Sequence, residues 1–168
     1  MKPSPNEYDS YYANYIARVK NDDLLSALHQ STDTSAQFWS SIPAEKGTYR
    51  YGQGKWSVKE ILGHIIDTER IFCYRAVAFA RGETTALTGY DHNAYVDRSN
   101  ADSRNLEEMI EELAAVRTST FTLFKSFNED LLKTIGNANG NDMSVRAAGF
   151  VIVGHEMHHS EVIRERYL

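Results

Sequence analysis

The sequence has a single cysteine, Cys73, and no long hydrophobic run. One cysteine excludes an internal disulfide framework and a cysteine-based zinc knuckle, so any metal ligands must be His, Asp or Glu side chains. No stretch approaches the roughly 18 apolar residues of a membrane-spanning helix, and residues 1–10 lack the apolar core of a signal peptide. These absences predict a cytoplasmic protein that does not enter the membrane.

Basic residues are also few. The 18 Lys and Arg residues are outnumbered by 23 Asp and Glu residues, which gives a formal net charge of −5 and a pI near 5.7. Without a basic patch we expect no nucleic-acid partner. The 42% hydrophobic and 24% charged residues are typical of a globular protein, and 168 residues suffice for one core. We therefore expect a single domain over residues 1–168.

The spacing of the hydrophobic residues predicts an all-α fold. Helical periodicity marks four long segments, preceded by a short Tyr-rich segment that is expected to form an extra N-terminal helix. The expected helices cover residues 8–19, 23–41, 58–81, 104–127 and 144–168. No strand-like alternation of useful length occurs. Because helices of this number and length bury their apolar faces against one another, we expect an antiparallel four-helix bundle.

Start and stop signals are clearest for the second long helix. Ser57 and Glu60 are spaced as a capping box, and Gly82 follows the last periodic residue. Residues 83–103 form a polar connection whose length is uncommon in compact domains and often functional. The Asn-rich segment 137–141 predicts a turn.

The fourth long helix carries two histidines on its apolar face. His155 and His159 are four residues apart, so their imidazoles lie one above the other. On a helical wheel centred on Ile152, at about 100° per residue, both fall within about 60° of the centre, whereas His158 falls about 120° away. Histidine at a core position costs desolvation unless it is hydrogen-bonded or coordinated. One such histidine is usually a satisfied core residue, but a stacked pair favours a metal site.

A third ligand must come from another helix, because a catalytic zinc site uses three protein ligands and a water. His64, on the flank of the apolar stripe of the second long helix, is the natural candidate, although alone it would be interpreted as a boundary residue. We therefore predict one divalent metal ion bound by His64, His155 and His159. His29 and His92 are expected to be solvated.

Two other motifs overlap with this pair. His155-Glu156-x-x-His159 matches the H-E-x-x-H signature of zinc proteases, in which Glu156 would be the general base. That class needs a third ligand downstream and strands upstream, and neither is found. Glu156-x-x-His159 is also one copy of the Glu-x-x-His pattern of di-iron bundles, but there is no second copy. A protease or di-iron protein is not expected, while Glu156 remains a candidate catalytic residue beside the metal.

Four further residues are candidates for the site. Arg117 falls inside the apolar stripe of the third long helix, and we favour pairing with a core carboxylate such as Glu69. The alternative is a catalytic role, since arginine grips an anionic substrate group through two hydrogen bonds. Arg75 has the same two interpretations, the second of which makes it a substrate-binding residue. Tyr90 and Tyr95 are expected to line the mouth of the site from the long connection.

Residues spread in order over nearly the whole chain carry a family resemblance. They are residues 55–64, Glu69, Arg70, Arg75, Arg81, Gly82, and residues 113–117, 154–159 and 164–167. In these the chain resembles the DinB/YfiT-like family of metal-binding four-helix bundles. The resemblance implies a three-histidine site at His64, His155 and His159 that holds zinc or nickel with water on its open face.

The resemblance also implies a range of activities. Members of the family are thiol transferases and isomerases that use low-molecular-weight thiols, and others are described as metal-dependent hydrolases. We therefore expect a metal-dependent transferase or hydrolase acting on a small, anionic molecule. The alternative is a non-catalytic, metal-stabilised bundle with a binding or stress-response role. Three good ligands, where structural zinc usually has four, favour the reactive site. A homodimer would be the commonest form of self-association.

Overall fold

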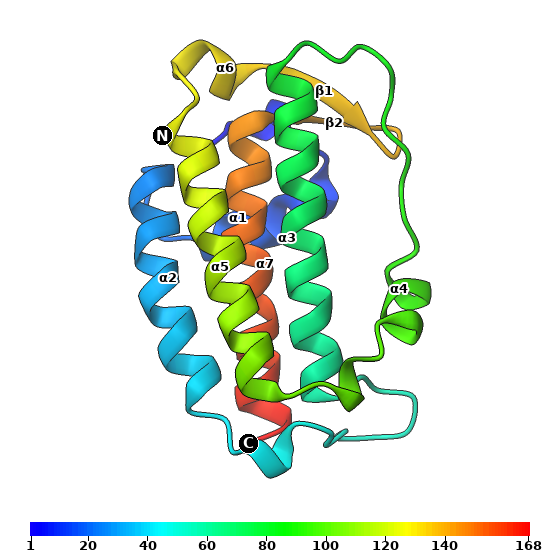
Figure 1. The fold of residues 1–168 in the computed structure, drawn as a ribbon. Helices are drawn as coiled ribbons and strands as arrows, with labels where there is room; N and C mark the ends of the chain where they lie inside the picture. Colours follow the sequence, from blue (N-terminus) through cyan, green and yellow to red (C-terminus); the bar gives the residue numbers. More distant parts are fainter.

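A computed structural model describes residues 1–168 and confirms the four-helix bundle predicted from the sequence (Figure 1). The long helices are α2 (Leu24–Ser40), α3 (Val58–Ala80), α5 (Leu106–Lys125) and α7 (Val145–Arg166). The shorter elements are α1 (Ala13–Arg18), α4 (His92–Arg98), α6 (Glu129–Lys133), β1 (Ile135–Ala138) and β2 (Asn141–Ser144). None of the helices has the length and apolar character needed to span a membrane.

Capping side chains start the long helices at the predicted places. The Ser57 hydroxyl accepts from the Glu60 backbone N–H at 3.0 Å, and the Glu60 carboxylate accepts from the Ser57 N–H at 2.7 Å. Asp23 caps α2 and Ser144 caps α7, and each side chain accepts one hydrogen bond from a backbone N–H of the first turn. Gly82 follows α3 with a φ of 80°, in the left-handed region that glycine adopts without strain. Local sequence therefore determines these boundaries.

Helices α3 and α5 run in the same direction, and α2 and α7 run opposite to both (Figure 1). Both α2 and α3 pack against α5 and α7, so that antiparallel and parallel neighbours alternate around the bundle. A parallel pair needs a connection that returns along the whole length of the bundle. The connection predicted at residues 83–103 has this role, and it contains α4, which packs beside α3 (Figure 1).

The expectation that the chain forms no strands is wrong in one place. β1 and β2 form an antiparallel hairpin that pairs Gly136 with Met143. Its two-residue turn, Asn139-Gly140, has φ values of 56° and 76°, as a type I′ turn requires. Strands of four residues are too short to show alternation in the sequence, whereas the turn itself was predicted within residues 137–141. The hairpin covers one end of the bundle (Figure 1).

Two hydrophobic clusters make up the core, and a layer of buried polar side chains separates them. The cluster at the hairpin end includes Phe79, Phe124 and Phe150, and the cluster at the other end includes Trp39 and Leu62. The polar layer between them consists of Ser31, Ser35, Thr68, Glu69, Arg117, Thr120, His155, Glu156 and Ser160. All four long helices contribute to this layer, so the chemistry of the molecule is concentrated at mid-height in the bundle.

A buried ion pair fastens the N-terminal segment to the bundle. Arg146 Nε donates to Glu7 Oε2 at 2.7 Å, and both side chains are largely buried. The hydrogen bonds from Arg146 lower the pKa of Glu7 from its ordinary value of 4.5 to about 2. The segment that follows Glu7 carries Tyr11, Tyr12 and Tyr15 to the histidines of α7 and the adjoining cavity. The pair therefore helps to hold one wall of the site in place.

This pair predicts a defined loss of stability in acid. A carboxyl whose pKa is lowered on folding contributes stability above its unfolded pKa, and the contribution is lost as the pH falls through the folded pKa. We expect the free energy of unfolding to fall between pH 4.5 and about 2, and Glu7→Gln to remove this part of the decrease. At neutral pH the substitution should cost about 1–3 kcal/mol, measured by urea denaturation. The control Glu45→Gln, at an exposed position, should change neither the stability at neutral pH nor its decrease in acid. Equal pH profiles of the unfolding free energy for wild type and Glu7→Gln would contradict the prediction.

Candidate metal centre

Three histidine nitrogens meet between α3 and α7. Nε2 of His155 lies 3.0 Å from Nε2 of His64 and 3.1 Å from Nε2 of His159. His64 comes from α3, and the other two come from successive turns of α7. His64 and His155 are buried, and His159 is half-buried. The structure thus brings together the three residues that the sequence proposed as ligands.

The spacing of these nitrogens fits a single metal ion. Metal–nitrogen bonds of about 2.0–2.1 Å in a tetrahedral site place two ligand nitrogens about 3.3 Å apart, close to the 3.0 and 3.1 Å found here. All three ligand atoms lie within 4.8 Å of one another. Hydrogen bonding explains the arrangement less well, because Nε2 of a neutral imidazole is either a donor or an acceptor. His155 could therefore satisfy only one of its two neighbours without an ion.

The electrostatic environment keeps the three imidazoles neutral. Burial lowers the pKa of His64 to about 4, with a further contribution from His92. Burial and then the neighbouring imidazoles lower the pKa of His159 to about 3, and the pKa of His155 falls well below its usual value for the same reasons. Metal binding requires the neutral form of histidine. Near neutral pH all three side chains present that form.

The histidine cluster lies on the wall of a cavity of about 550 Å³. The cavity is lined by Tyr11, Tyr12, Tyr15, Trp56, His64, Thr68, Phe72, Arg75, Gly89, Tyr90, His92, Asn139, Asn141, Val151, His155 and His159. No Asp or Glu residue is among them, and Arg75 is the only side chain in the lining with a permanent charge. The lining therefore carries one permanent positive charge and no negative charge, a combination that favours anions over cations.

A chain of polar contacts supports His64 from behind. The Thr68 hydroxyl, one helical turn along α3, lies 3.5 Å from Nδ1 of His64 and 2.9 Å from the hydroxyl of Tyr90. Partners of this kind on the second ring nitrogen orient metal-binding histidines. The long connection therefore reaches the site through Tyr90.

Gly154 allows α1 to approach α7 beside the cluster. A Cβ atom at position 154 would lie 2.0 Å from the backbone oxygen of Tyr15, so no larger residue fits without displacing α1. The close approach stacks the Tyr15 ring edgewise against His155 and His158, at ring-centroid distances of 5.5 and 5.6 Å. His158, predicted to point away from the apolar face, therefore packs on the phenol outside the ligand cluster.

The model of the DinB superfamily matches residues 27–163. This chain belongs to the DinB superfamily. The match confirms the resemblance found in the sequence, and the matched region contains all three clustered histidines. No curated protein matches the chain.

Two solved structures have a similar fold. YfiT from Bacillus subtilis, described as a probable metal-dependent hydrolase with an unusual four-helix bundle topology, matches with a TM-score of 0.76 at 17% identity. The match covers 98% of this chain and 90% of YfiT. The mycothiol-dependent maleylpyruvate isomerase matches with a TM-score of 0.66 at 12% identity, over 82% of this chain and 58% of the isomerase. At these identities the likeness is one of fold.

Arg117 and Glu156 lie away from the histidine cluster, in the bundle interior. Arg117 donates to both carboxylate oxygens of Glu69 and to Glu156 Oε2, each at 2.8 Å. The other oxygen of Glu156 lies 3.3 Å from the indole nitrogen of Trp39. Burial acts to lower the pKa of Arg117, but the two carboxylates outweigh it and raise the pKa above its usual range. The structure therefore shows the pairing with Glu69 that we favoured.

The catalytic role predicted for Glu156 does not agree with this placement. Glu156 follows His155 by one residue, which rotates it about 100° around α7. Its side chain accordingly lines a separate cavity of about 780 Å³ together with residues of α2 such as Ser31. Neither Glu156 nor Arg117 is part of the lining of the histidine cavity.

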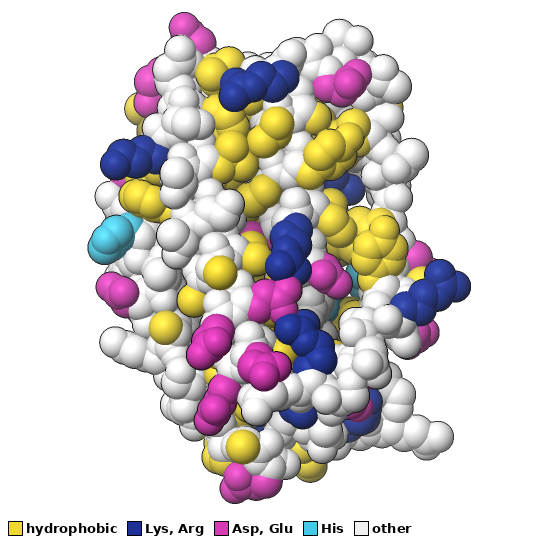
Figure 2. All heavy atoms as spheres, viewed as in Figure 1, with side chains coloured by type: hydrophobic (Ala, Val, Ile, Leu, Met, Phe, Trp, Pro, Cys, Tyr) yellow, Lys and Arg dark blue, Asp and Glu magenta, His cyan; other side chains and the backbone are white.

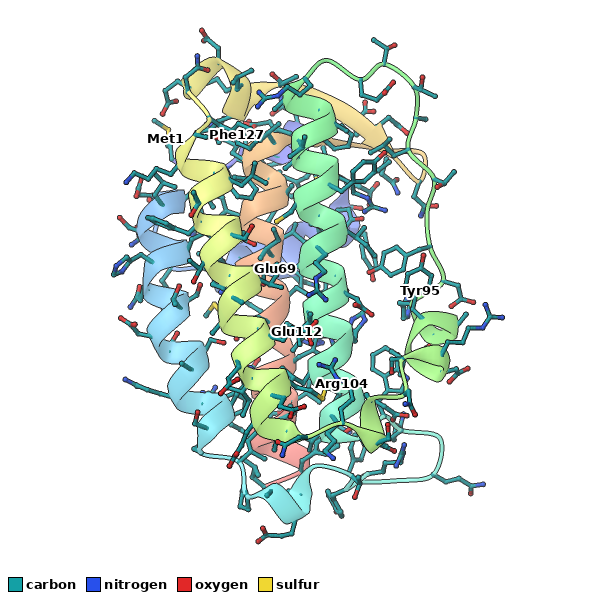
Figure 3. The ribbon with its side chains drawn as sticks, in the orientation of Figure 1. Met1, Glu69, Tyr95, Arg104, Glu112 and Phe127 are labelled. Atoms are coloured by element: carbon teal, nitrogen blue, oxygen red, sulfur yellow. The ribbon has the colours of Figure 1, made fainter.

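A second ionic cluster on the same helices lies at the surface. Glu112 of α5 pairs with Arg70 of α3 and with Arg104; Glu112 and Arg104 are labelled in Figure 3. Acidic and basic side chains are interspersed over this face of the molecule (Figure 2). Glu69, labelled in the same view as Glu112, belongs instead to the buried cluster with Arg117 (Figure 3). The two clusters have similar chemistry and opposite exposure.

The long connection contributes to the site more than its sequence indicated. Tyr90 lines the cavity, as expected from its place in the long connection. Tyr95, which was expected to do the same, is not part of the lining; it is half exposed on α4 and packs against Tyr90 at a ring-centroid distance of 5.1 Å (Figure 3). His92, expected to be solvated, is exposed but lies with its ring centroid 5.8 Å from that of His64 and 5.9 Å from that of Trp56. Sequence spacing could not reveal this, because α4 reaches the site across the bundle surface.

Proposed function

We propose that this protein is a metal-dependent transferase, with a thiol as one substrate, or a hydrolase, and that it acts on a small anionic molecule. The observation that supports this most directly is that the cluster of His64, His155 and His159 opens into a cavity with no acidic lining. Structural zinc sites usually fill four positions with protein ligands. Three ligands beside a cavity leave a position for a reactant, and zinc or nickel suits three imidazoles.

The residues around the cluster suit this chemistry. An ion held by three neutral imidazoles would keep its full charge and lower the pKa of a water or thiol bound beside it. The Thr68 hydroxyl contacts Nδ1 of His64 and orients its imidazole, and the hydroxyl of Tyr90 contacts that of Thr68. Burial raises the pKa of Tyr12 and Tyr90, so both phenols are protonated and can donate hydrogen bonds to a substrate.

The similar structures support testing both reactions. YfiT is described as a probable metal-dependent hydrolase, and the isomerase is described as mycothiol-dependent. Because the likeness is one of fold, the relatives only suggest which reactions to assay first, and the positive cavity suggests anionic substrates.

Metal content and turnover test the proposal together. Protein purified without a histidine tag should contain about one zinc or nickel ion per chain by elemental analysis. Panels of thiol-plus-electrophile substrates and of hydrolysable anionic esters and amides should show turnover that a chelator abolishes and added metal restores. The exposed His29→Ala variant should behave as the wild type in both measurements.

Two outcomes would count against the proposal in different ways. Wild-type protein that neither contains nor takes up metal would remove its basis. Metal that raises the melting temperature without turnover in either panel would favour the alternative, a non-catalytic bundle stabilised by its metal.

A further inference from the structure

Two arginines are deeply buried, and only one of them has an acidic partner. Arg117 pairs with two carboxylates, whereas Arg75, only 4% exposed, takes part in none of the ion pairs of the structure. A guanidinium remains charged under all physiological conditions, and a buried charge without a counter-ion is strongly unfavourable. Arg75 lines the histidine cavity, so an anionic ligand there would provide the missing charge.

The surroundings of Arg75 suit an oxyanion. Its guanidinium carbon lies 5.0 Å from the centre of the Phe72 ring, which supports the side chain from one face. Tyr12 and Tyr90 line the same cavity as Arg75, and its positive charge opposes the rise in the pKa that burial causes in both phenols. A guanidinium and two phenols can all donate hydrogen bonds to one carboxylate or phosphate group.

The position of Arg75 on α3 separates this group from the metal centre. Arg75 and His64 are 11 residues apart on the helix, which corresponds to about 16 Å along its axis. Long side chains lean toward the helix N-terminus, so Arg75 and His64 lean the same way along α3 and the longer arginine closes only part of this gap. A separation of roughly 10 Å remains between the guanidinium and the histidine nitrogens. One carboxylate cannot span that distance.

We propose that Arg75, with Tyr12 and Tyr90, binds the carboxylate or phosphate end of an elongated substrate whose other end reacts at the histidine cluster. The inference rests on the proposed function for the reacting end, whereas the anion subsite itself requires no metal. It restricts the substrate class to chain-like molecules in which several atoms separate the anionic group from the thiol or from the bond to be cleaved. Compact anions would occupy one end only.

Thiols of graded length provide the first test. Metal-loaded protein is titrated by calorimetry with ω-mercaptocarboxylates, from mercaptoacetate to mercaptoundecanoate, and with ω-mercaptoalcohols of the same lengths. The alcohols control for burial of the alkyl chain. We expect the ratio of carboxylate to alcohol affinity to peak at an intermediate length, at about 10- to 100-fold. A ratio that does not depend on length would overturn the proposed span between the two ends.

Three variants assign the effect to Arg75. Arg75→Gln should abolish the peak while leaving alcohol affinity, metal content and helical circular dichroism unchanged. Arg75→Lys keeps the positive charge without the planar guanidinium, and should recover part of the preference for carboxylates over alcohols. It also keeps the proposal testable if Arg75→Gln fails to fold. Arg70→Gln, on the exposed side of the same helix, should match the wild type. A peak that persists in a folded Arg75→Gln protein would overturn the assignment.

A metal-free titration separates this subsite from the proposed reaction. Acetate and phosphate are titrated into metal-free protein, with the fluorescence of Trp56 in the cavity lining as the signal and Trp56→Phe as its control. Binding of either anion that is lost in Arg75→Gln supports the subsite, and their relative affinity identifies the preferred head group. If the anions bind in this way but no thiol binds to metal-loaded protein, the proposed function is contradicted and the anion subsite is still supported. No difference between wild type and Arg75→Gln with either anion overturns the subsite.

Discussion

His155→Ala is expected to abolish stable metal binding, and with it any metal-dependent turnover, while leaving the fold intact. Nε2 of His155 is the central atom of the cluster, 3.0 Å from that of His64 and 3.1 Å from that of His159. Without it, two imidazoles on different helices remain. Loss of a residue that only orients a ligand already reduces metal affinity 10- to 100-fold, so loss of the central ligand should exceed about 100-fold. Elemental analysis and titration with zinc would measure the change.

Two histidine variants serve as matched controls for this result. His158→Ala alters the same helix within one turn of the cluster, and His29→Ala alters an exposed residue of α2. Both should retain the wild-type metal content. Circular dichroism should show the same helix content in all three variants. Full metal occupancy in a folded His155→Ala protein would mean that the ion is held elsewhere, and would exclude this cluster as the metal centre.

Arg117→Ala is expected to lower the free energy of unfolding by about 3–5 kcal/mol, the largest effect on stability that we predict. The substitution leaves Glu69 and Glu156, which are 2% and 4% exposed, as buried carboxylates without a counter-ion. It also removes the partner that Arg117 provides for the Ser31 hydroxyl. Urea denaturation of wild type and variant at neutral pH, fitted with one shared dependence of the free energy on urea concentration, would measure the difference in free energy of unfolding.

Comparison with the surface cluster separates burial from ion pairing. Arg104→Ala breaks a partly exposed pair with Glu112 and should cost about 1 kcal/mol or less. Replacing Arg117, Glu69 and Glu156 together with Met, Leu and Leu should recover most of the stability lost in Arg117→Ala, because no unpaired charge remains. If Arg117→Ala instead reduced substrate affinity without reducing stability, its side chain would have to act as a substrate anchor.

Local sequence was sufficient for the elements and for two of the three clustered histidines. The capping box at Ser57 and the glycine at Gly82 determine where α3 begins and ends through contacts within a few residues. His155 and His159 are neighbours because the α-helix repeats every 3.6 residues, so a separation of four places them on one face. The hairpin was missed because its four-residue strands depend on pairing with each other and on the turn at Asn139.

These sequence patterns could not predict the order of the helices around the bundle. Periodicity shows which face of a helix is buried, but not which neighbour covers that face. The parallel arrangement of α3 and α5 follows from the route of the connection between them, which carries Tyr90 and His92 to the cavity (Figure 1). The addition of His64 to the α7 pair likewise depends on the packing of α3 against α7.

The sequence by itself determined that the chain is a helical bundle of the DinB type with two stacked histidines and several inward-facing charged residues. Only the tertiary structure decided the surroundings of each charge. Arg117 and Arg75 had the same two interpretations in the sequence, yet one meets Glu69 and Glu156 while the other faces a cavity without acidic residues. Whether a buried cation is neutralised depends on side chains that other helices bring to it, and those contacts exist only after the helices have packed.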